Sequence, residues 1–338
     1  MSQPADITTA TAGEQRHVLA SNAQYLISMA ARAPSVHNSQ PWRFRVSPEA
    51  VELWSDPRRK VAADPIGREM LISCGAALFG LRLAVRSLGY RPVVDLFPDR
   101  SRLRLVASVG VGPAAPMSPL QRQMLAAVPH RHTHRGPFSP GPLPAGLLAG
   151  LQNDALTERA VLALVTDALA YQRLERIVAA AARHGDIDPG AREAIRRWTR
   201  IQGSAARDGV PAVALAARAP RQVQPGRLPQ RDFDLGRGIA RLPGGGEPPS
   251  ATAVLLTSGD RRADWVRAGQ ALQRLLLHAA SVWVFASLHT QPLENAVTRA
   301  LIRDQLALAG YPQMVLQLGP AVTTASTARR TPGDLMGR

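Results

Sequence analysis

The sequence predicts an α+β protein made of two units in tandem, and three observations lead to this class. Amphipathic helical patterns alternate with short apolar strands along most of the chain. Its 338 residues are enough for two domains of ordinary size. A helix leads into a strand through Leu88-Gly89-Tyr90 and again through Ala309-Gly310-Tyr311. This echo indicates two diverged copies of one α+β unit.

The first unit is predicted to span residues 15–112. Its first strand is the clearest element, because apolar Trp42, Phe44 and Val46 alternate with two arginines, as in a half-buried strand. Gly89 follows a long apolar helical stretch and is a natural C-terminal cap. The elements expected here are helices over 17–33 and 67–88, and strands over 42–46, from 51 onward, over 93–97 and over 103–109.

The second unit is predicted to span residues 117–321, with an insertion over about 185–250. Its expected helices cover 119–128, 143–151, 168–184, 263–280 and 292–309, and its expected strands cover 254–257 and 314–318. Residues 1–14 and 322–338 are expected to be flexible tails.

The insertion differs in composition from the rest of the chain. Residues 188–207 can form a basic helix, and prolines mixed with glycine and arginine follow without periodicity up to about residue 250. A stretch of this length inside a compact chain indicates a lid over a site or a disordered excursion. The residues alone leave both interpretations open.

Composition limits the classes of function. The formal net charge is +16, but the basic residues are spread over the whole length and only Lys60 is a lysine, while aromatic residues make up 4%. Both facts argue against nucleic-acid binding, which uses clustered charge and stacking side chains. The single cysteine, Cys74, excludes an intrachain disulfide and a cysteine-based zinc site. Because neither a membrane-length apolar run nor a secretory signal is visible, we expect a cytoplasmic protein without a membrane partner.

The most informative segment is the corner of residues 33–42, which joins the first helix to the first strand. Pro34 and Pro41 stiffen it at both ends. Between them the corner carries a set of side-chain donors and acceptors, which suits a planar ligand with polar edges: Ser35, His37, Asn38 and Gln40.

A second candidate segment is the run of residues 130–135. If it is extended, Arg131, Thr133 and Arg135 share one side and the three histidines the other. Two guanidinium groups and a hydroxyl within about 14 Å of strand make a credible clamp for a phosphate monoester. The histidine side could instead bind a metal ion, although no carboxylate or cysteine lies near it in sequence to complete the ligand shell.

These two segments resemble the nitroreductase superfamily of FMN proteins. The corner is similar to the family's APS-x-(H/T)N-x-QPW signature, and residues 130–135 are similar to the element that holds the FMN phosphate. Further segments, such as Gly67-Arg68-Glu69 and Gln291-Pro292-Leu293-Glu294, resemble the Acg-type branch, whose members carry two nitroreductase units in one chain. The resemblance covers about residues 17–320.

The resemblance implies a nitroreductase-like fold in which the two units form an intrachain pseudo-dimer, so that a monomer is expected. One FMN would bind between the units. Arg131, Thr133 and Arg135 would hold its phosphate, and Pro34, Ser35, His37, Asn38 and Gln40 would line its ring. The flavin would carry hydride from NAD(P)H to a nitroaromatic or a quinone, with no catalytic side chain and no metal. The alternative is a flavin-sequestering protein of the Acg type, whose lid blocks turnover.

Two departures from the family pattern bear on this site. The family's last strand usually has an arginine near the phosphate, in an L-R-x-G context. Here Gln317 takes that place, and we expect it to make a weaker phosphate contact. The family also has a glycine-containing turn against the flavin ring, where this chain has Trp283. That tryptophan could stack on the ring, block it or turn into the core.

Overall fold

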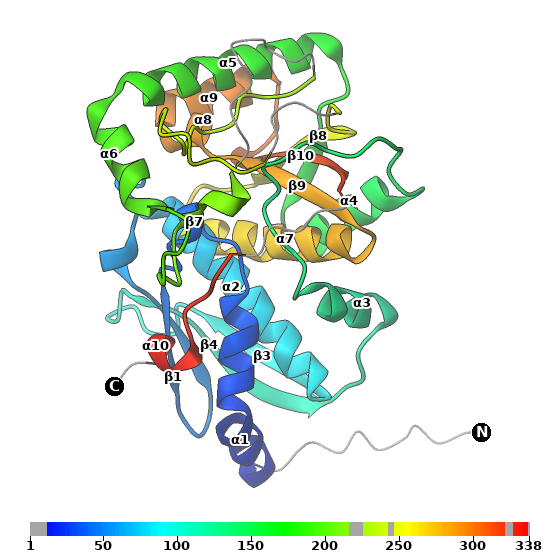
Figure 1. Cartoon of the computed structure of the whole chain (residues 1–338). Coiled ribbons are helices and arrows are strands. Elements are labelled where there is room, and N and C mark those ends of the chain that lie inside the picture. The colour runs from blue at the N-terminus through cyan, green and yellow to red at the C-terminus, as the bar shows by residue number, and fades with distance from the viewer. Residues whose placement is uncertain (1–11, 216–225, 243–246, 322–326, 337–338) are drawn as a thin grey trace, which may run out of the picture.

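The computed structural model describes residues 12–215, 226–242, 247–321 and 327–336, arranged as two four-stranded sheets with helices between and around them (Figure 1). The strand order is β1-β2-β4-β3 in one sheet and β5-β8-β10-β9 in the other. Neighbouring strands are antiparallel throughout both sheets. The α+β class predicted from the sequence is confirmed.

The elements of the first half follow the predicted order. Trp42 and Phe44 of the first strand are fully buried and pair with Ser55 and Leu53 of the second, as the alternating pattern predicts. The last strand is longer than predicted and runs through Gly112 to residue 114. The elements are α1 (Ala12–Ala31), β1 (Trp42–Val46), β2 (Val51–Ser55), α2 (Arg68–Ser87), β3 (Tyr90–Leu96) and β4 (Leu105–Ala114).

The second half has more elements than the sequence predicts. They are α3 (Pro119–Ala127), α4 (Leu147–Thr157), β5 (Val161–Leu164), α5 (Ala168–Ile187), α6 (Pro189–Trp198), β6 (Thr199–Arg200), β7 (Val210–Pro211), β8 (Ala251–Thr257), α7 (Arg262–Ser281), β9 (Val284–His289), α8 (Gln291–Glu294), α9 (Ala296–Gln305), β10 (Tyr311–Pro320) and α10 (Pro332–Leu335).

Three predictions in this half were wrong in detail. The strands β5 and β9 were missed, because β5 is short and β9 is buried on both faces, so that it lacks the alternation of a half-exposed strand. The helix expected over 292–309 is two helices, because Asn295 adopts an extended conformation and its side chain caps α9 by accepting from Val297 N at 2.7 Å. The basic helix expected over 188–207 ends at Trp198, where the chain becomes extended.

The two halves repeat one arrangement of elements, with α1, β1, β2, α2, β3 and β4 corresponding to α4, β5, β8, α7, β9 and β10. The repeat is present, but the two similar triplets that predicted it lie before strands that do not correspond to each other. Gly89 precedes β3, whereas Gly310 precedes β10, which is the counterpart of β4. The similar triplets are therefore not copies of one another.

The corresponding helices α2 and α7 cross in direct backbone contact. A Cβ atom added at Gly75 of α2 would lie 2.1 Å from the carbonyl oxygen of Val266, and one added at Gly269 of α7 would lie 1.9 Å from that of Ile72. Each glycine thus meets the residue three positions before the other glycine, so the contact is reciprocal. Larger residues would force the helices apart.

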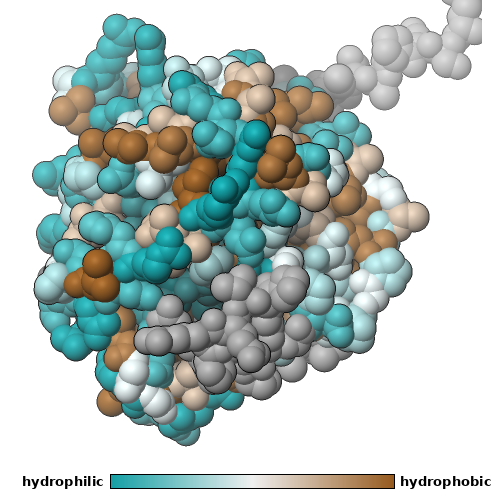
Figure 2. Space-filling model, turned by 90° about the horizontal axis from the view of Figure 1, so that it is seen from above, coloured by the Kyte–Doolittle hydropathy of each residue, from teal (hydrophilic) through white to brown (hydrophobic). Residues whose placement is uncertain are grey.

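The main hydrophobic core extends through both halves. It contains fully buried residues of α1, β1 and β2 together with residues of α7 and β8. Helix α2 is long and apolar enough to span a membrane, but 78% of its most apolar window is buried inside the protein, as expected of a central core helix. On the face seen in Figure 2, hydrophobic residues alternate with hydrophilic ones and form no single broad apolar area.

The segment of residues 327–336 folds back onto the first half, where α10 lies beside β1 (Figure 1). Leu335 is fully buried, and Met336 forms a parallel bridge with Phe44 of β1. The expectation of a flexible tail was therefore wrong for 327–336. Residues 1–11, 322–326 and 337–338 lie outside the described residues.

Candidate functional site

The corner of residues 33–42 is a compact turn with strained backbone. His37, Asn38 and Gln40 have φ values of 52°, 55° and 49°, in the left-handed region that non-glycine residues rarely adopt. The Ser35 hydroxyl closes the turn by accepting a hydrogen bond from Gln40 N at 3.0 Å. Strain of this kind persists only where the surroundings enforce it, and it is frequent at ligand sites.

A cavity of about 910 Å³, part of it open to solvent, lies beside this corner. Helices α2 and α7 and the end of β9 form its other walls, so both halves of the chain contribute to it. The residues that carry the argument below are Pro34, Ser35, His37, Glu69, Thr133, Arg135, Arg231, Phe233 and His289.

Three buried polar atoms on residues that line this cavity have no hydrogen-bond partner among the described residues: His37 Nδ1, Glu69 Oε2 and His289 Nε2. Burial, with Arg231 and Arg135 nearby, holds the pKa of His37 well below its usual value. Burial also lowers the pKa of His289 to about 4, although its Nδ1 donates to the Pro229 carbonyl at 3.1 Å. Both rings are therefore neutral at pH 7. Buried polar atoms are seldom left without partners, so these three mark a place for a ligand with polar edges.

Residues 130–135 run beside β9, with Thr133 in a parallel bridge to Ala286 and His134 N donating to the Ala286 carbonyl at 2.8 Å. Thr133 and Arg135 line the cavity. The rings of His130 and His132 instead pack on Trp283 and Phe285, with centroids 5.0 and 4.4 Å apart. No group of three or more His, Cys, Asp or Glu residues within the described part of the chain could hold a metal ion.

Arg131 lies at one end of a buried arginine cluster, which we define as Arg131, Arg135 and Arg329. Burial lowers the pKa of Arg131 and of Arg135 to about 10, and burial with the charges of neighbouring arginines holds that of Arg329 well below its usual value. Arg131 and Arg329 also line a small cavity of their own, together with Arg32.

No carboxylate of a described residue forms an ion pair with any member of the arginine cluster. Arg131 donates to the Arg32 carbonyl and Arg329 to the Ala33 carbonyl, but the Nε atoms of both have no partner. Buried charge without a counter-charge is costly, so the cluster is suited to an anion such as a phosphate.

Four of the predicted site residues lie outside the cavity: Arg131, which lines the small cavity described above, and Asn38, Gln40 and Gln317. Asn38 Nδ2 donates to the Gly209 and Ala328 carbonyls at 3.0 Å each. Gln40 Nε2 donates to the Arg207 carbonyl at 2.7 Å, and its Oε1 accepts from Arg330 N at 2.8 Å. These two side chains thus fasten other segments to the corner and do not line the cavity.

Gln317 is also engaged elsewhere. Its Oε1 accepts from Leu228 N at 3.0 Å, and its Nε2 donates to the Gly226 carbonyl at 3.1 Å. Gln317 therefore anchors the insertion to β10 and is not placed for the weakened phosphate contact expected from the sequence.

Trp283 takes none of the three orientations considered from the sequence. Its side chain is 53% exposed and lies parallel to the ring of His130, with an angle of 8° between the two planes. Trp283 does not line the cavity, so it neither stacks on a ligand there nor blocks one.

The described part of the insertion that reaches the cavity is residues 226–233, which we call the lid segment. Phe233 meets the edge of the His37 ring with centroids 5.3 Å apart. Arg231 forms an ion pair with Glu294 of α8, and Gln230 Nε2 donates to Ser287 Oγ at 3.0 Å. The side chains of Gln230, Arg231 and Phe233 all line the cavity. Residues 216–225 and 243–246 of the insertion lie outside the described residues.

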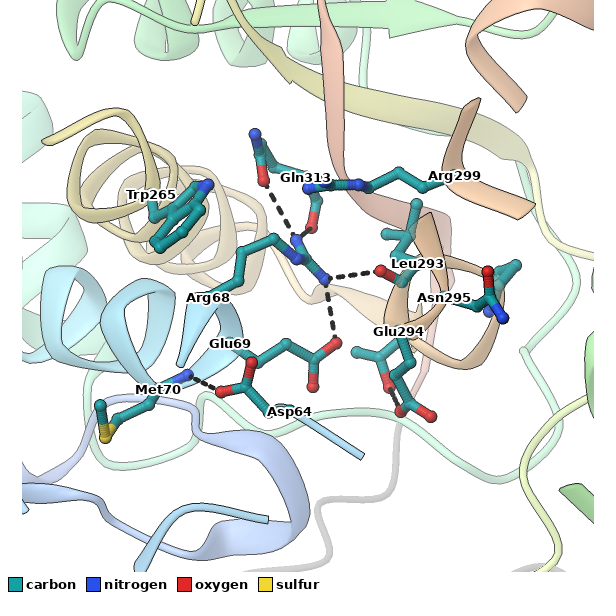
Figure 3. A network of polar contacts seen from close by, with 12 residues as sticks. Asp64, Arg68, Glu69, Met70, Trp265, Leu293, Glu294, Asn295, Arg299 and Gln313 are labelled. Carbon is teal, nitrogen blue, oxygen red and sulfur yellow. Dashed lines mark hydrogen bonds and ion pairs between the residues drawn. The ribbon is translucent and has the colours of Figure 1, made fainter. Parts of the chain in front are cut away.

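Glu69 belongs to a buried network at the N-terminal end of α2 (Figure 3). Arg68 donates to Glu69 Oε1 at 3.1 Å, to the Leu293 carbonyl at 3.2 Å and to Gln313 Oε1 at 3.0 Å. Burial, followed by the charge of Glu294, raises the pKa of Glu69 to about 8, although Arg68 acts in the opposite direction. Glu69 is therefore largely protonated at pH 7, with Oε2 free on the cavity side.

The raised pKa of Glu69 leads to a stability prediction for Glu69→Gln. Because the folded protein holds this proton up to about pH 8 and the unfolded chain releases it near pH 4.5, the wild type loses unfolding free energy as pH rises between these values. Glutamine cannot ionise, so the variant should gain stability relative to wild type at pH 8 and gain little at pH 5. Urea midpoints at both pH values measure this.

A suitable control is Glu193→Gln, because this carboxylate is 74% exposed and its pair with Arg196 is long, at 3.6 Å. The control should keep the wild-type pH dependence. Parallel stability curves for wild type and Glu69→Gln would show that Glu69 ionises normally in the folded protein.

Sequence reasoning missed Arg329 and Glu69 as site residues. Arg329 lies 296 residues from its partner Ala33, and nothing local marks it as more than one of many arginines. Glu69 stood inside a segment noted for its family resemblance, but as an acidic residue near a helix start it was also a plausible helix-stabilising group. A carboxylate at the start of an otherwise apolar, buried helix was the signal available.

The fold and the site together define a two-unit α+β protein with a cavity that is lined in part by Arg135 and Arg231. A relative from Mycobacterium tuberculosis, with the name "Putative NAD(P)H nitroreductase", is 35% identical over 313 residues, which cover 91% of this chain and 87% of the relative. The protein of that organism called "Putative NAD(P)H nitroreductase acg" is 28% identical over 312 residues, covering 90% of this chain and 91% of the relative. The chain belongs to the nitroreductase family.

Other comparisons add less. No family model matches the chain. Among solved structures, a nitroreductase with bound FMN from Bacteroides fragilis has 13% identity and a TM-score of 0.36, covering 61% of this chain and 94% of that one. One from Desulfitobacterium hafniense, also with bound FMN, has 13% identity and a TM-score of 0.38, with coverages of 62% and 94%.

Proposed function

We propose that the protein binds one FMN in the cavity beside the corner and uses it as an NAD(P)H-dependent oxidoreductase. The observation that carries this proposal is a cavity with three polar atoms that have no partner among the described residues, lined by Arg135 of the arginine cluster, whose other members Arg131 and Arg329 line a small cavity of their own. FMN has a flat ring with polar edges and a phosphate at the end of a flexible chain. Both features of the site match it.

The residues present divide between the two parts of such a ligand. Arg131 and Arg329 are suited to hold the phosphate, because they are charged, buried and lacking an anionic partner. Ser35, His37, Thr133 and Arg135 line the cavity and are suited to position the ring. The sequence prediction assigned Arg131, Thr133 and Arg135 to the phosphate. In this proposal Arg131 keeps that role, and Thr133 and Arg135 are assigned to the ring.

When bound, FMN would supply the transfer of hydride from NAD(P)H to a nitroaromatic or quinone acceptor. The chain's own contribution is orientation and the exclusion of water, to which the strained corner and the lid segment are suited. The correspondence of the two sheets supports an intrachain pseudo-dimer, in which the corner of one unit and residues 131–135 of the other form one site.

A second candidate function is flavin sequestration, as in the alternative drawn from the sequence. The lid segment favours it, because Phe233 contacts His37 and Arg231 pairs with Glu294, with Phe233, His37 and Arg231 all lining the cavity. The two functions share the cofactor and differ in whether a nicotinamide can reach it.

The test of the proposed function begins with the titration of FMN into apoprotein, followed by flavin fluorescence. We expect saturation at one FMN per chain. Addition of NADPH without oxygen should then bleach the flavin absorbance, and a quinone should restore it. Binding without bleaching would support sequestration, and no binding at all would contradict both candidates.

A further inference from the structure

A second cavity, of about 1360 Å³ and open to solvent, lies on the other side of the crossing of α2 and α7. It shares no lining residue with the first. Its walls are the C-terminal half of α2, the N-terminal half of α7, strand β3 and the loop that joins α4 to β5. Six arginines line it against one carboxylate: Arg82, Arg86, Arg91, Arg159, Arg267 and Arg274, with Glu158.

The second cavity is the counterpart of the first in the repeated arrangement. Because the contact of Gly75 with Gly269 is reciprocal, these two glycines occupy equivalent positions. A residue of α2 therefore corresponds to the residue of α7 that lies the same number of positions from its own glycine. Ser73 and Ala76 line the first cavity, and the corresponding Arg267 and Gln270 line the second. In the same way, the corner after α1 corresponds to residues 157–159 after α4, and β9 corresponds to β3.

The chemistry of the second cavity differs from that of the first. Residues 157–159 form a shorter connection than the corner, and their one carboxylate, Glu158, is already paired with Arg82 and Arg274. Gln270 also accepts a hydrogen bond from Arg82 at 2.7 Å. In place of neutral polar groups, the second cavity presents guanidinium groups. It is therefore unsuited to a second flavin ring and suited to an anion.

Ion pairs neutralise half of these arginines. Glu158 pairs with Arg82 at 2.6 Å and with Arg274 at 3.3 Å, and Asp154 also pairs with Arg274, at 2.7 Å. Asp264 pairs with Arg267 at 3.0 Å. These pairs hold the inner guanidinium groups in place.

Among the described residues, no carboxylate forms an ion pair with the other three arginines, Arg86, Arg91 and Arg159. Arg86 donates to Gln121 Oε1 at 3.4 Å and to the Pro116 carbonyl, which leaves its charge unbalanced. Arg91 and Arg159 are exposed. The cavity thus has an excess of positive charge, and its apolar floor is formed by buried Phe79, Leu83 and Met124.

We propose that the second cavity binds a small organic polyphosphate, with its phosphate groups against Arg86, Arg91 and Arg159 and its organic part on the apolar floor. Arginine is the residue best suited to multidentate contacts with phosphate oxygens. The arginines line a concave cavity and not a flat basic surface, and this shape favours a small molecule over a nucleic-acid strand.

The experiment measures ADP binding by isothermal titration calorimetry at physiological salt, with and without saturating FMN. We expect ADP to bind in both cases, pyrophosphate to bind more weakly and adenosine not to bind. The variant Arg91→Gln/Arg159→Gln should weaken ADP binding at least tenfold, because two charged contacts are lost. The matched control, Arg176→Gln/Arg183→Gln on α5, removes the same charge far from the cavity and should bind ADP as the wild type does.

Three outcomes would overturn the proposal. They are the absence of binding by both ADP and pyrophosphate, an equal loss in the control variant, and competition between ADP and FMN. The second outcome would show non-specific attraction to a basic protein, and the third would place ADP in the first cavity. Because ADP binding is measured without FMN as well, the result does not depend on the proposed oxidoreductase function.

Discussion

Replacing Arg131 or Arg329 by alanine should weaken FMN binding by about 1.5–3 kcal/mol each, or roughly ten- to hundredfold, because each variant loses a charge-assisted contact to phosphate. Binding of riboflavin, which has no phosphate, should change little. Arg131 is buried, Arg329 is partly buried, and neither has an anionic partner among the described residues, so their charges are available to the ligand. Fluorescence titration of both flavins into apoprotein measures the difference.

Thermal unfolding of the same variants provides an independent readout. Removing a buried, unpaired charge should leave the apoprotein as stable as wild type or more so, while the stabilisation gained on adding FMN should shrink. Arg183→Ala, an exposed change on α5, is the control and should bind FMN normally. Equal losses for FMN and riboflavin would indicate that Arg131 and Arg329 shape the site without touching a phosphate.

Opening the lid segment should have the largest effect on rates. In Arg231→Ala/Phe233→Ala, the ion pair with Glu294 and the contact with the His37 ring are both lost. We expect NADPH to reduce bound FMN at least tenfold faster in this variant, and FMN to dissociate faster as well. The reason is that the closed lid segment limits the access of both nicotinamide and water to the site. Stopped-flow absorbance follows the first rate, and capture of released FMN follows the second.

Arg241→Ala is a matched control for the lid variant. Arg241 is an exposed residue of the same insertion, and among the described residues its side chain donates to the nearby Gly238 and Ala240 carbonyls alone. In the Arg241→Ala variant, the rates of FMN reduction and FMN dissociation should equal those of wild type. If the lid variant also shows unchanged rates, residues 226–233 do not control access, and an open reductase becomes the better description.

Much of the fold could be predicted from the sequence because its elements carry local signals. The alternation of Trp42, Phe44 and Val46 identified β1, and the long apolar run ending before Gly89 identified α2. Strand β9 could not be found in this way, because both of its faces are buried and a short apolar run is equally compatible with a helix. The break between α8 and α9 depends on the extended backbone of Asn295, which hydrophobic periodicity does not register.

The candidate site was predicted only in part, for a related reason. Ser35, His37, Thr133 and Arg135 line one cavity, and they lie on segments with distinctive composition; their contacts with FMN remain a prediction. Asn38, Gln40 and Gln317 carry the same polar groups, but their partners are backbone atoms of distant segments, and sequence patterns do not show which way such a side chain points. Site residues that come from distant segments and share no local sequence pattern can be recognised only in the folded structure.

The contact between Gln40 and Arg330 joins residues 290 positions apart, and the neighbouring Arg329 is a member of the arginine cluster. During synthesis the corner therefore leaves the ribosome long before the segment that completes its surroundings. The two sheets can begin to form earlier, but the arginine cluster cannot assemble until residue 329 has emerged. We infer that cofactor capture follows translation and does not guide it, so a nascent chain must hold its strained corner through other contacts in the meantime.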